Sequence, residues 1–128
     1  MKYLGLDYGR ARTGVAVSDD EGTLAFPRTV LYSLPEERLF KSLAEIIETE
    51  KARVIVVGLP SAGEGIDPNW KKEVEAFAHR LEVKLQIQVI WENEMFTTKI
   101  AEIHSKKKSD ASAAALILQS FLDRQNRI

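Results

Sequence analysis

Hydrophobic and polar positions near the start of the chain alternate with turn residues in the manner of a small antiparallel sheet. A short apolar run ends at Asp7, and a glycine-containing turn separates it from a second run. The segment Asp-Asp-Glu-Gly that follows is typical of a tight turn, so the chain is expected to return as a third strand. The three predicted strands cover residues 3–6, 15–18 and 23–31. Pro27 favours an edge position for the third strand, because proline cannot donate a hydrogen bond to a neighbour.

A helix is expected after the third strand. Ser33 is a candidate N-cap, Pro35 lies near the first turn, and Glu36 and Glu37 suit the positive end of the helix dipole. The apolar positions that follow share one helical face. They are Leu39, Phe40, Leu43, Ile46 and Ile47.

Two more strands and a second helix are predicted in the middle of the chain. The continuous apolar run over 54–57, followed by Gly-Leu-Pro, is typical of a parallel strand buried on both faces. A second helix then presents an apolar face made of Val74, Phe77, Ala78 and Leu81. Alternating apolar positions over 85–91 predict a fifth strand that ends near Glu92.

The last third of the chain is expected to be helical. A short helix over 97–103 and a long helix over 109–127 flank a basic segment, Ser-Lys-Lys-Lys-Ser. The order of elements predicts an α/β fold built on a mixed five-stranded sheet. The first three strands form an antiparallel meander, the other two add in parallel, and helices cover both faces. We expect residues 1–128 to form a single domain.

Composition narrows the classes of protein that fit this outline. The 128 residues are enough for one domain, and 45% apolar residues are enough for a core. Cysteine is absent, so disulfides and thiolate metal sites are excluded, and a cytoplasmic location is expected. No stretch is apolar and long enough to span a bilayer, so no membrane partner is expected. The net charge of −1 provides no overall attraction for nucleic acid, which would have to be held by a local patch.

Acidic residues stand at several ends of predicted elements. Asp7 ends the first strand, Glu92 and Glu94 lie at the end of the fifth, and Asp110 starts the last helix. Ligands of α/β sheets collect where strands end and loops converge, so these carboxylates are expected to meet. Clustered carboxylates repel one another unless a proton or cation joins them, and hard oxygen ligands suit Mg²⁺ or Mn²⁺. Such ions can promote hydrolysis of a phosphodiester.

Simpler roles exist for each acid. Asp7 before a glycine also fits a turn residue or a contact to a nucleotide phosphate, and Asp110 also fits a helix cap. Glu92 or Glu94 alone would ordinarily be a surface residue.

Basic residues lie close in sequence to two of these acids. Arg10 and Arg12 flank the turn after Asp7. Lys106, Lys107 and Lys108 directly precede the last helix. All five are candidate contacts for a phosphate backbone, although a lysine run is also typical of a solvated loop.

Four motifs, in order along nearly the whole chain, resemble the YqgF family. They are GLDYGRARTGVAVSD with Ala25-Phe26-Pro27, VVGLP with the glycine-containing loop after it, NEMFTT, and SDASAAALILQSFLD. The family is described as Holliday junction resolvases and as nucleases that mature pre-16S ribosomal RNA. The resemblance implies a ribonuclease H-like fold and a nuclease that depends on Mg²⁺ or Mn²⁺.

The resemblance also implies particular site residues. The family's three acids correspond to Asp7, Glu94 and Asp110, which would bind the metal and carry out catalysis. Arg12 corresponds to an arginine that contacts phosphate or braces the first turn. The family often shows Asp-Glu-Arg before its Thr-Thr pair, whereas this chain has Asn93-Glu94-Met95. The glutamate is retained, and Glu92 is the alternative ligand if the local register is shifted.

Several functions stay open at this point. The leading expectation is an endonuclease for structured RNA, acting as a monomer or weak dimer. A four-way DNA junction is an alternative substrate, and it would favour a dimer with two active sites. A non-catalytic nucleic-acid-binding scaffold of the same fold is a third possibility. The sugar kinase and actin ATPase superfamily fits less well, because 128 residues cannot supply its two domains.

Overall fold

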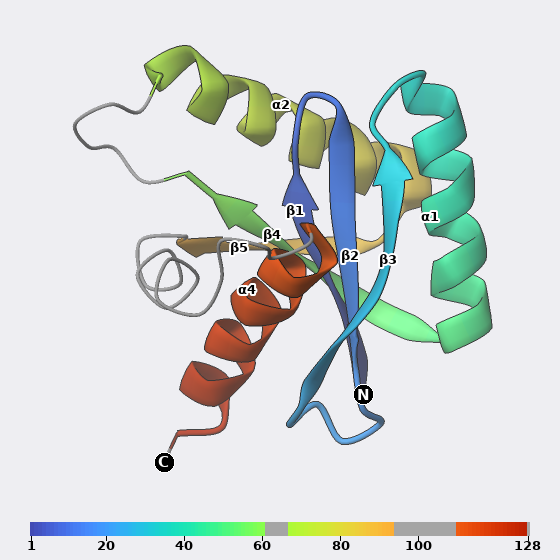
Figure 1. Cartoon of the computed structure of the whole chain (residues 1–128). Coiled ribbons are helices and arrows are strands. Elements are labelled where there is room, and N and C mark those ends of the chain that lie inside the picture. The colour runs from blue at the N-terminus through green and yellow to red at the C-terminus, as the bar shows by residue number, and fades with distance from the viewer. Residues whose placement is uncertain (61–66, 94–109, 128) are drawn as a thin grey trace.

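A computed structural model provides the structure of this protein, and it describes residues 1–60, 67–93 and 110–127 (Figure 1). Five strands and three helices are present within these residues. In chain order they are β1 (Lys2–Tyr8), β2 (Arg12–Ser18), β3 (Ala25–Tyr32), α1 (Glu36–Glu50), β4 (Ala52–Leu59), α2 (Pro68–Leu85), β5 (Gln88–Asn93) and α4 (Asp110–Gln125). The predicted short helix over 97–103 lies outside the described residues.

The sheet has the strand order β3-β2-β1-β4-β5. Strands β1, β2 and β3 form an antiparallel meander, while β4 pairs in parallel with β1 and β5 pairs in parallel with β4. The predicted mixed sheet is therefore confirmed. The edge position predicted for Pro27 is also confirmed: Pro27 pairs with Ala16 on edge strand β3, next to a register shift.

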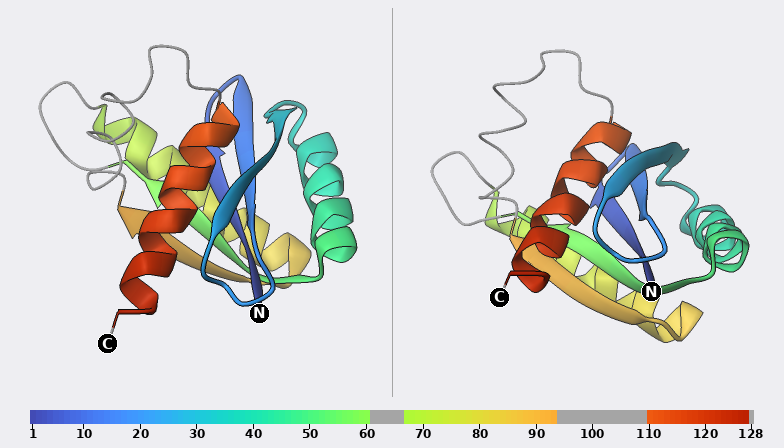
Figure 2. Two further views of the ribbon diagram at one scale, coloured as in Figure 1. Left: turned by 60° about the horizontal axis from the view of Figure 1, so that its bottom comes forward. Right: turned by 90° about the horizontal axis from the view of Figure 1, so that it is seen from below.

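Helices cover both faces of the sheet, as predicted (Figure 2). Helices α1 and α2 lie on one face, where Leu39, Leu43, Phe77 and Leu81 pack against Leu4, Leu6, Ile55 and Val57. Helix α4 lies on the other face, where Ala114, Ile117, Leu118 and Leu122 pack against Tyr3, Ala16, Val54 and Val56. Consecutive side chains of a strand point to opposite faces, so each central strand contributes to both clusters.

Several predicted element boundaries are wrong; β2, for example, starts at Arg12 instead of residue 15. Ser33 is not the N-cap of α1, because Pro35 occupies that position and makes no side-chain capping bond. Leu85 does not belong to the fifth strand but ends α2, where it continues the apolar stripe of that helix at a spacing of four residues after Leu81. Gln86, in the left-handed conformation, then ends the helix, and β5 starts at Gln88.

None of the described helices is both long enough and apolar enough to cross a membrane.

Helix α4 lies unusually close to β1 at Gly5. A Cβ atom on Gly5 would lie 2.7 Å from the Cβ atom of Leu118 and 2.9 Å from the carbonyl oxygen of Ala114. Real Cβ atoms essentially never approach so closely, so only glycine allows this packing. The contact places the first turns of α4 beside the carboxyl-terminal half of β1.

Replacing Gly5 with alanine is expected to push α4 away from the sheet. Overpacking of this kind lowers the free energy of unfolding by about 1–3 kcal/mol. Denaturant unfolding of Gly5→Ala measures the loss, with Ser120→Ala on α4 as a control expected to change it by less than about 0.5 kcal/mol. Equal stability of Gly5→Ala and the unmodified protein would contradict the close contact.

Candidate active site

Asp7 lies near the carboxyl-terminal end of β1, where it pairs with Gly14 of β2. Its side chain is half-buried. Tyr3 belongs to the cluster beneath α4 and Gly5 contacts that helix, so Asp7, two residues further along the strand, faces the α4 side as well. The predicted ligand therefore lies at the strand end on the side of the sheet that α4 covers.

Both neighbours of Asp7 in the sheet are glycines. Gly14 pairs with it directly, and Gly58 of β4 lies at its level on the other side, because Leu6 pairs with Val57. Neither residue has a side chain to fill the space beside the carboxylate. Both glycines are buried, so only backbone flanks the carboxylate at this level of the sheet.

The first residue of α4 is Asp110. The contacts of Gly5 with Ala114 and Leu118 show that the helix starts toward the end of β1 that carries Asp7. The helix backbone thus brings Asp110 toward the same edge of the sheet as Asp7. The side chain of Asp110 and the whole of Glu94 lie outside the described residues, as do Lys106, Lys107 and Lys108.

The chemistry of this edge fits a hard divalent cation. Carboxylate oxygens are the preferred protein ligands of Mg²⁺ and Mn²⁺, and Asp7 brings one carboxylate to this edge between two glycines. Within residues 1–60, 67–93 and 110–127, no three acidic or histidine side chains gather into a metal-binding group. The full set of predicted ligands therefore depends on Glu94 and Asp110.

Glu92, the alternative ligand, has a different environment. Its side chain is 0% exposed, and one carboxylate oxygen accepts a hydrogen bond from the guanidinium group of Arg124 in α4. Arg124 follows Asp110 by almost four helical turns, which is about 21 Å along the helix axis. Helix α4 crosses the sheet obliquely, so its last turns hold Glu92 while its first turns lie beside β1 (Figure 1). This buried ion pair indicates a structural role for Glu92.

The turn after Asp7 is held by buried hydroxyl groups. Ser33 donates a hydrogen bond to the carbonyl oxygen of Gly9 at 2.5 Å, and its oxygen lies 2.8 Å from the hydroxyl oxygen of Thr13. Its backbone N–H also donates to the carbonyl oxygen of Ala11. Ser33, which the sequence suggested as a helix cap, instead ties the end of β3 to the turn between β1 and β2.

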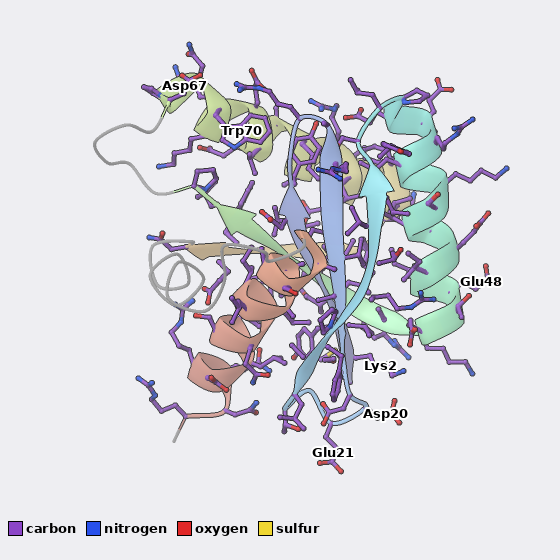
Figure 3. The ribbon with its side chains drawn as sticks, in the orientation of Figure 1. Lys2, Asp20, Glu21, Glu48, Asp67 and Trp70 are labelled. Atoms are coloured by element: carbon purple, nitrogen blue, oxygen red, sulfur yellow. The ribbon has the colours of Figure 1, made fainter. Side chains whose placement is uncertain are left out.

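Arg10 is held on the side of the sheet that α2 covers. Its guanidinium lies 4.6 Å from the centroid of the Trp70 ring, and its nitrogens lie 3.6 Å from carboxylate oxygens of Asp67 and Glu73. Figure 3 shows Asp67 and Trp70 together at the start of α2. The side chain of Arg10 remains 63% exposed, so a phosphate that binds it would compete with two nearby carboxylates.

A stack of aromatic rings supports this position. The ring of Tyr8 lies between Trp70, at 5.6 Å, and Phe77, at 3.8 Å between centroids, with nearly parallel planes. Burial and the nearby Glu36 carboxylate raise the pKa of the Tyr8 hydroxyl, so this group stays neutral at physiological pH. The stack gives the segment just after Asp7 a rigid support on the α2 side. The sequence contains no motif for it, since its rings come from two distant elements.

Arg12 is exposed at the first position of β2 and pairs with Tyr32 of β3. Register places Arg12 on the same face as Gly14 and Asp7, two residues before Gly14. Of the two arginines predicted to contact nucleic acid, Arg12 lies on the face of Asp7, whereas Arg10 is engaged on the α2 side.

A cleft at the opposite end of β1 does not share these properties. It is lined by residues that include Lys2, Asp20 and Glu50, and Figure 3 shows Lys2 and Asp20 at the far end of the molecule from Trp70. Lys2 lies 3.0 Å from Glu50 and 3.7 Å from Asp20, and Arg28 lies 2.9 Å from Glu50. Hydrogen bonds from Lys2 and Arg28 lower the pKa of Glu50. These charges neutralise one another, which indicates a structural cluster.

Comparison with known proteins identifies the family and the fold. The model of a family described as RuvX, Holliday junction resolvase, matches residues 1–124. The chain belongs to this family. The resemblance to YqgF proteins drawn from the four motifs is thereby confirmed.

Two relatives of similar length share the same name. A protein of Nitratidesulfovibrio vulgaris named as a pre-16S rRNA nuclease is 38% identical over 133 residues, covering 96% of this chain and 94% of its own. A protein of Sulfurihydrogenibium with the same name is 35% identical, with 96% and 90% covered.

Solved structures agree on the fold. Thermus thermophilus RuvC, solved in complex with a Holliday junction substrate, has a TM-score of 0.65 at 14% identity and covers 98% of this chain and 97% of its own. The fowlpox virus resolvase, solved with Holliday junction DNA, has a TM-score of 0.57 at 15% identity, with 99% and 100% covered. This member of the RuvX family therefore has the ribonuclease H-like fold of RuvC-type resolvases, as expected.

The structural role of Glu92 in this RuvX-family protein can be tested through its partner. Arg124→Met would leave a buried carboxylate without its cation, which costs about 3 kcal/mol of unfolding free energy. The double variant Glu92→Gln/Arg124→Met removes the buried charge as well and is expected to lose less.

Denaturant unfolding measures both variants. Arg127→Met, which removes an exposed arginine from the same end of the chain, is the matched control and is expected to cost less than about 0.5 kcal/mol. If Arg124→Met were no more destabilising than Arg127→Met, the ion pair would not hold Glu92 in place.

Proposed function

We propose that this protein is an endonuclease that uses Mg²⁺ or Mn²⁺ to hydrolyse phosphodiester bonds in structured RNA, with the precursor of 16S ribosomal RNA as its substrate. The observation that carries the proposal is the position of Asp7, at the end of β1, between two glycines and on the face where α4 begins with Asp110. The relatives named as pre-16S rRNA nucleases support the choice of substrate.

Asp7, Glu94 and Asp110 would hold the metal through their carboxylate oxygens. A bound ion of this kind makes water a stronger nucleophile and stabilises charge on the leaving oxygen. Arg12 lies on the face of Asp7 and would hold the backbone of the substrate, together with Lys106, Lys107 and Lys108.

A four-way DNA junction is the second candidate substrate. The description of the family as Holliday junction resolvases favours it. Symmetric cleavage of a junction needs two active sites related by a two-fold axis, and hence a dimer. Sedimentation that shows only monomer at high protein concentration would count against this substrate.

Replacement of a ligand is expected to abolish cleavage without unfolding the protein. Asp7→Asn and Asp110→Asn should each lower kcat/KM on an RNA substrate by at least about a hundredfold, because the amide is a poorer ligand for a hard cation. Chelation of divalent ions should abolish the activity of the unmodified protein, and added Mg²⁺ or Mn²⁺ should restore it. Gel analysis of labelled single-stranded, hairpin and four-way junction substrates measures these rates.

The pair Glu94→Gln and Glu92→Gln identifies the third ligand. Loss of cleavage in Glu94→Gln with activity retained in Glu92→Gln is the expected result, because Glu92 is occupied by Arg124. Equal cleavage in the unmodified protein, Asp7→Asn and Asp110→Asn would indicate a contaminating nuclease. Binding without cleavage by the unmodified protein in either metal would favour a non-catalytic scaffold.

A further inference from the structure

Tyr32, the last residue of β3, is 73% exposed, more than any other large hydrophobic side chain among the described residues. Within the part of the chain that the structure describes, no other aromatic ring packs against it, in contrast to Tyr3 and Tyr8. A single exposed ring is common on protein surfaces, so its exposure alone does not call for a partner. Its place in the sheet, however, indicates a partner.

Strand register puts Tyr32 on the same face of the sheet as Asp7. Asp7 pairs with Gly14, and Gly14 pairs with Val30. Tyr32 follows Val30 by two residues and therefore points to the same side. Asp7, Gly14 and Val30 form one row across three strands, and Tyr32 stands in the next row beside Arg12.

The spacing between the two side chains suits a nucleic-acid strand. Two strand intervals and one pair of residues along the strand separate Tyr32 from Asp7, which is roughly 12 Å between Cα atoms in a regular sheet. Gly14, in the row of Asp7, is buried and has no side chain, whereas Val30 beside it on β3 is exposed. A strand whose phosphate reaches Asp7 can thus place a nearby base over Tyr32.

The backbone that carries Tyr32 is fixed. Tyr32 pairs with Arg12 in the sheet, and the next residue, Ser33, is buried and bonded to Gly9, Ala11 and Thr13. A ring held on such a backbone loses little freedom when a base stacks on it. The positive charge of Arg12, on the neighbouring strand, is in place for the phosphate of the same nucleotide.

We propose that Tyr32, with Val30 beside it, is a stacking platform for an unpaired nucleobase of the substrate, near the phosphate that Asp7 receives. The proposal rests on the proposed nuclease function and adds to it a preference for a splayed or single-stranded base next to the cleavage position. Aromatic side chains at the surface commonly bind unpaired bases in this way, with little dependence on sequence.

The test is an equilibrium binding measurement by fluorescence anisotropy, with a short labelled single-stranded RNA and divalent ions chelated so that no cleavage occurs. Tyr32→Ala is expected to bind about tenfold more weakly than the unmodified protein, and Tyr32→Phe within about twofold of it. The matched control is Phe26→Ala. Phe26 is 49% exposed on the same strand but pairs with Val17 and faces the α1 side, so its loss is expected to leave affinity unchanged.

An abasic nucleotide moved along the RNA locates the stacked base. At one position it should weaken binding of the unmodified protein about tenfold and leave the affinity of Tyr32→Ala unchanged, because the two changes remove the same contact. The proposal is overturned if Tyr32→Ala binds like the unmodified protein, or if every abasic position weakens both proteins equally.

The outcomes separate this inference from the proposed function. If the unmodified protein neither binds nor cleaves nucleic acid, the nuclease function fails and the platform fails with it. If it binds and cleaves but Tyr32→Ala does not change affinity, only the platform fails. If sedimentation shows that Tyr32→Ala dissociates a dimer while RNA affinity is kept, the ring belongs to an interface between copies of the chain, which also overturns the platform.

Discussion

The close contact between α4 and Gly5 of β1 is the constraint on which the geometry of the site depends. Only a residue without a side chain allows the carbonyl oxygen of Ala114 and the Cβ atom of Leu118 to approach the strand so closely. That approach orients the helix so that its first residue, Asp110, is carried toward the strand end that bears Asp7. A single glycine in the core thereby influences the relation between two acids that are more than one hundred residues apart in the chain.

The two faces of the sheet differ in structure around the turn after Asp7. On the α2 side, rings from β1 and α2 stack and hold Arg10, which gives the turn a rigid base. On the α4 side, Asp7 is flanked by Gly14 and Gly58, which are buried and have no side chains. The buried hydroxyl of Ser33 connects the turn to β3. A site that must hold a phosphate in one position needs rigid support of this kind.

The differences between prediction and structure have identifiable physical causes. Ser33 has the residue type and the position in sequence of a helix cap. Its hydroxyl is buried, however, and a buried hydroxyl needs hydrogen-bond partners, which are Gly9 and Thr13 here. Over so short a segment, Leu85 fits an alternating strand pattern and a helical stripe equally well. In the structure it packs as part of α2. Glutamate is ordinarily a surface residue. Glu92 is nevertheless buried, and Arg124, at the far end of α4, supplies its counter-charge.

The sequence by itself determined the order of elements, the mixed sheet, the helices on both faces and the membership of the RuvX family. Those features follow from local periodicity and from motifs, both of which can be read directly from the sequence. The sequence also singled out Asp7 as a candidate metal ligand, because Asp7 ends an apolar strand inside the first of the four motifs. Tertiary structure alone decided that Glu92 is paired inside the protein, that Arg10 is engaged with α2, and that Tyr32 shares a face with Asp7. These contacts depend on strand register and on how α2 and α4 pack against the sheet. No short segment of sequence contains that information.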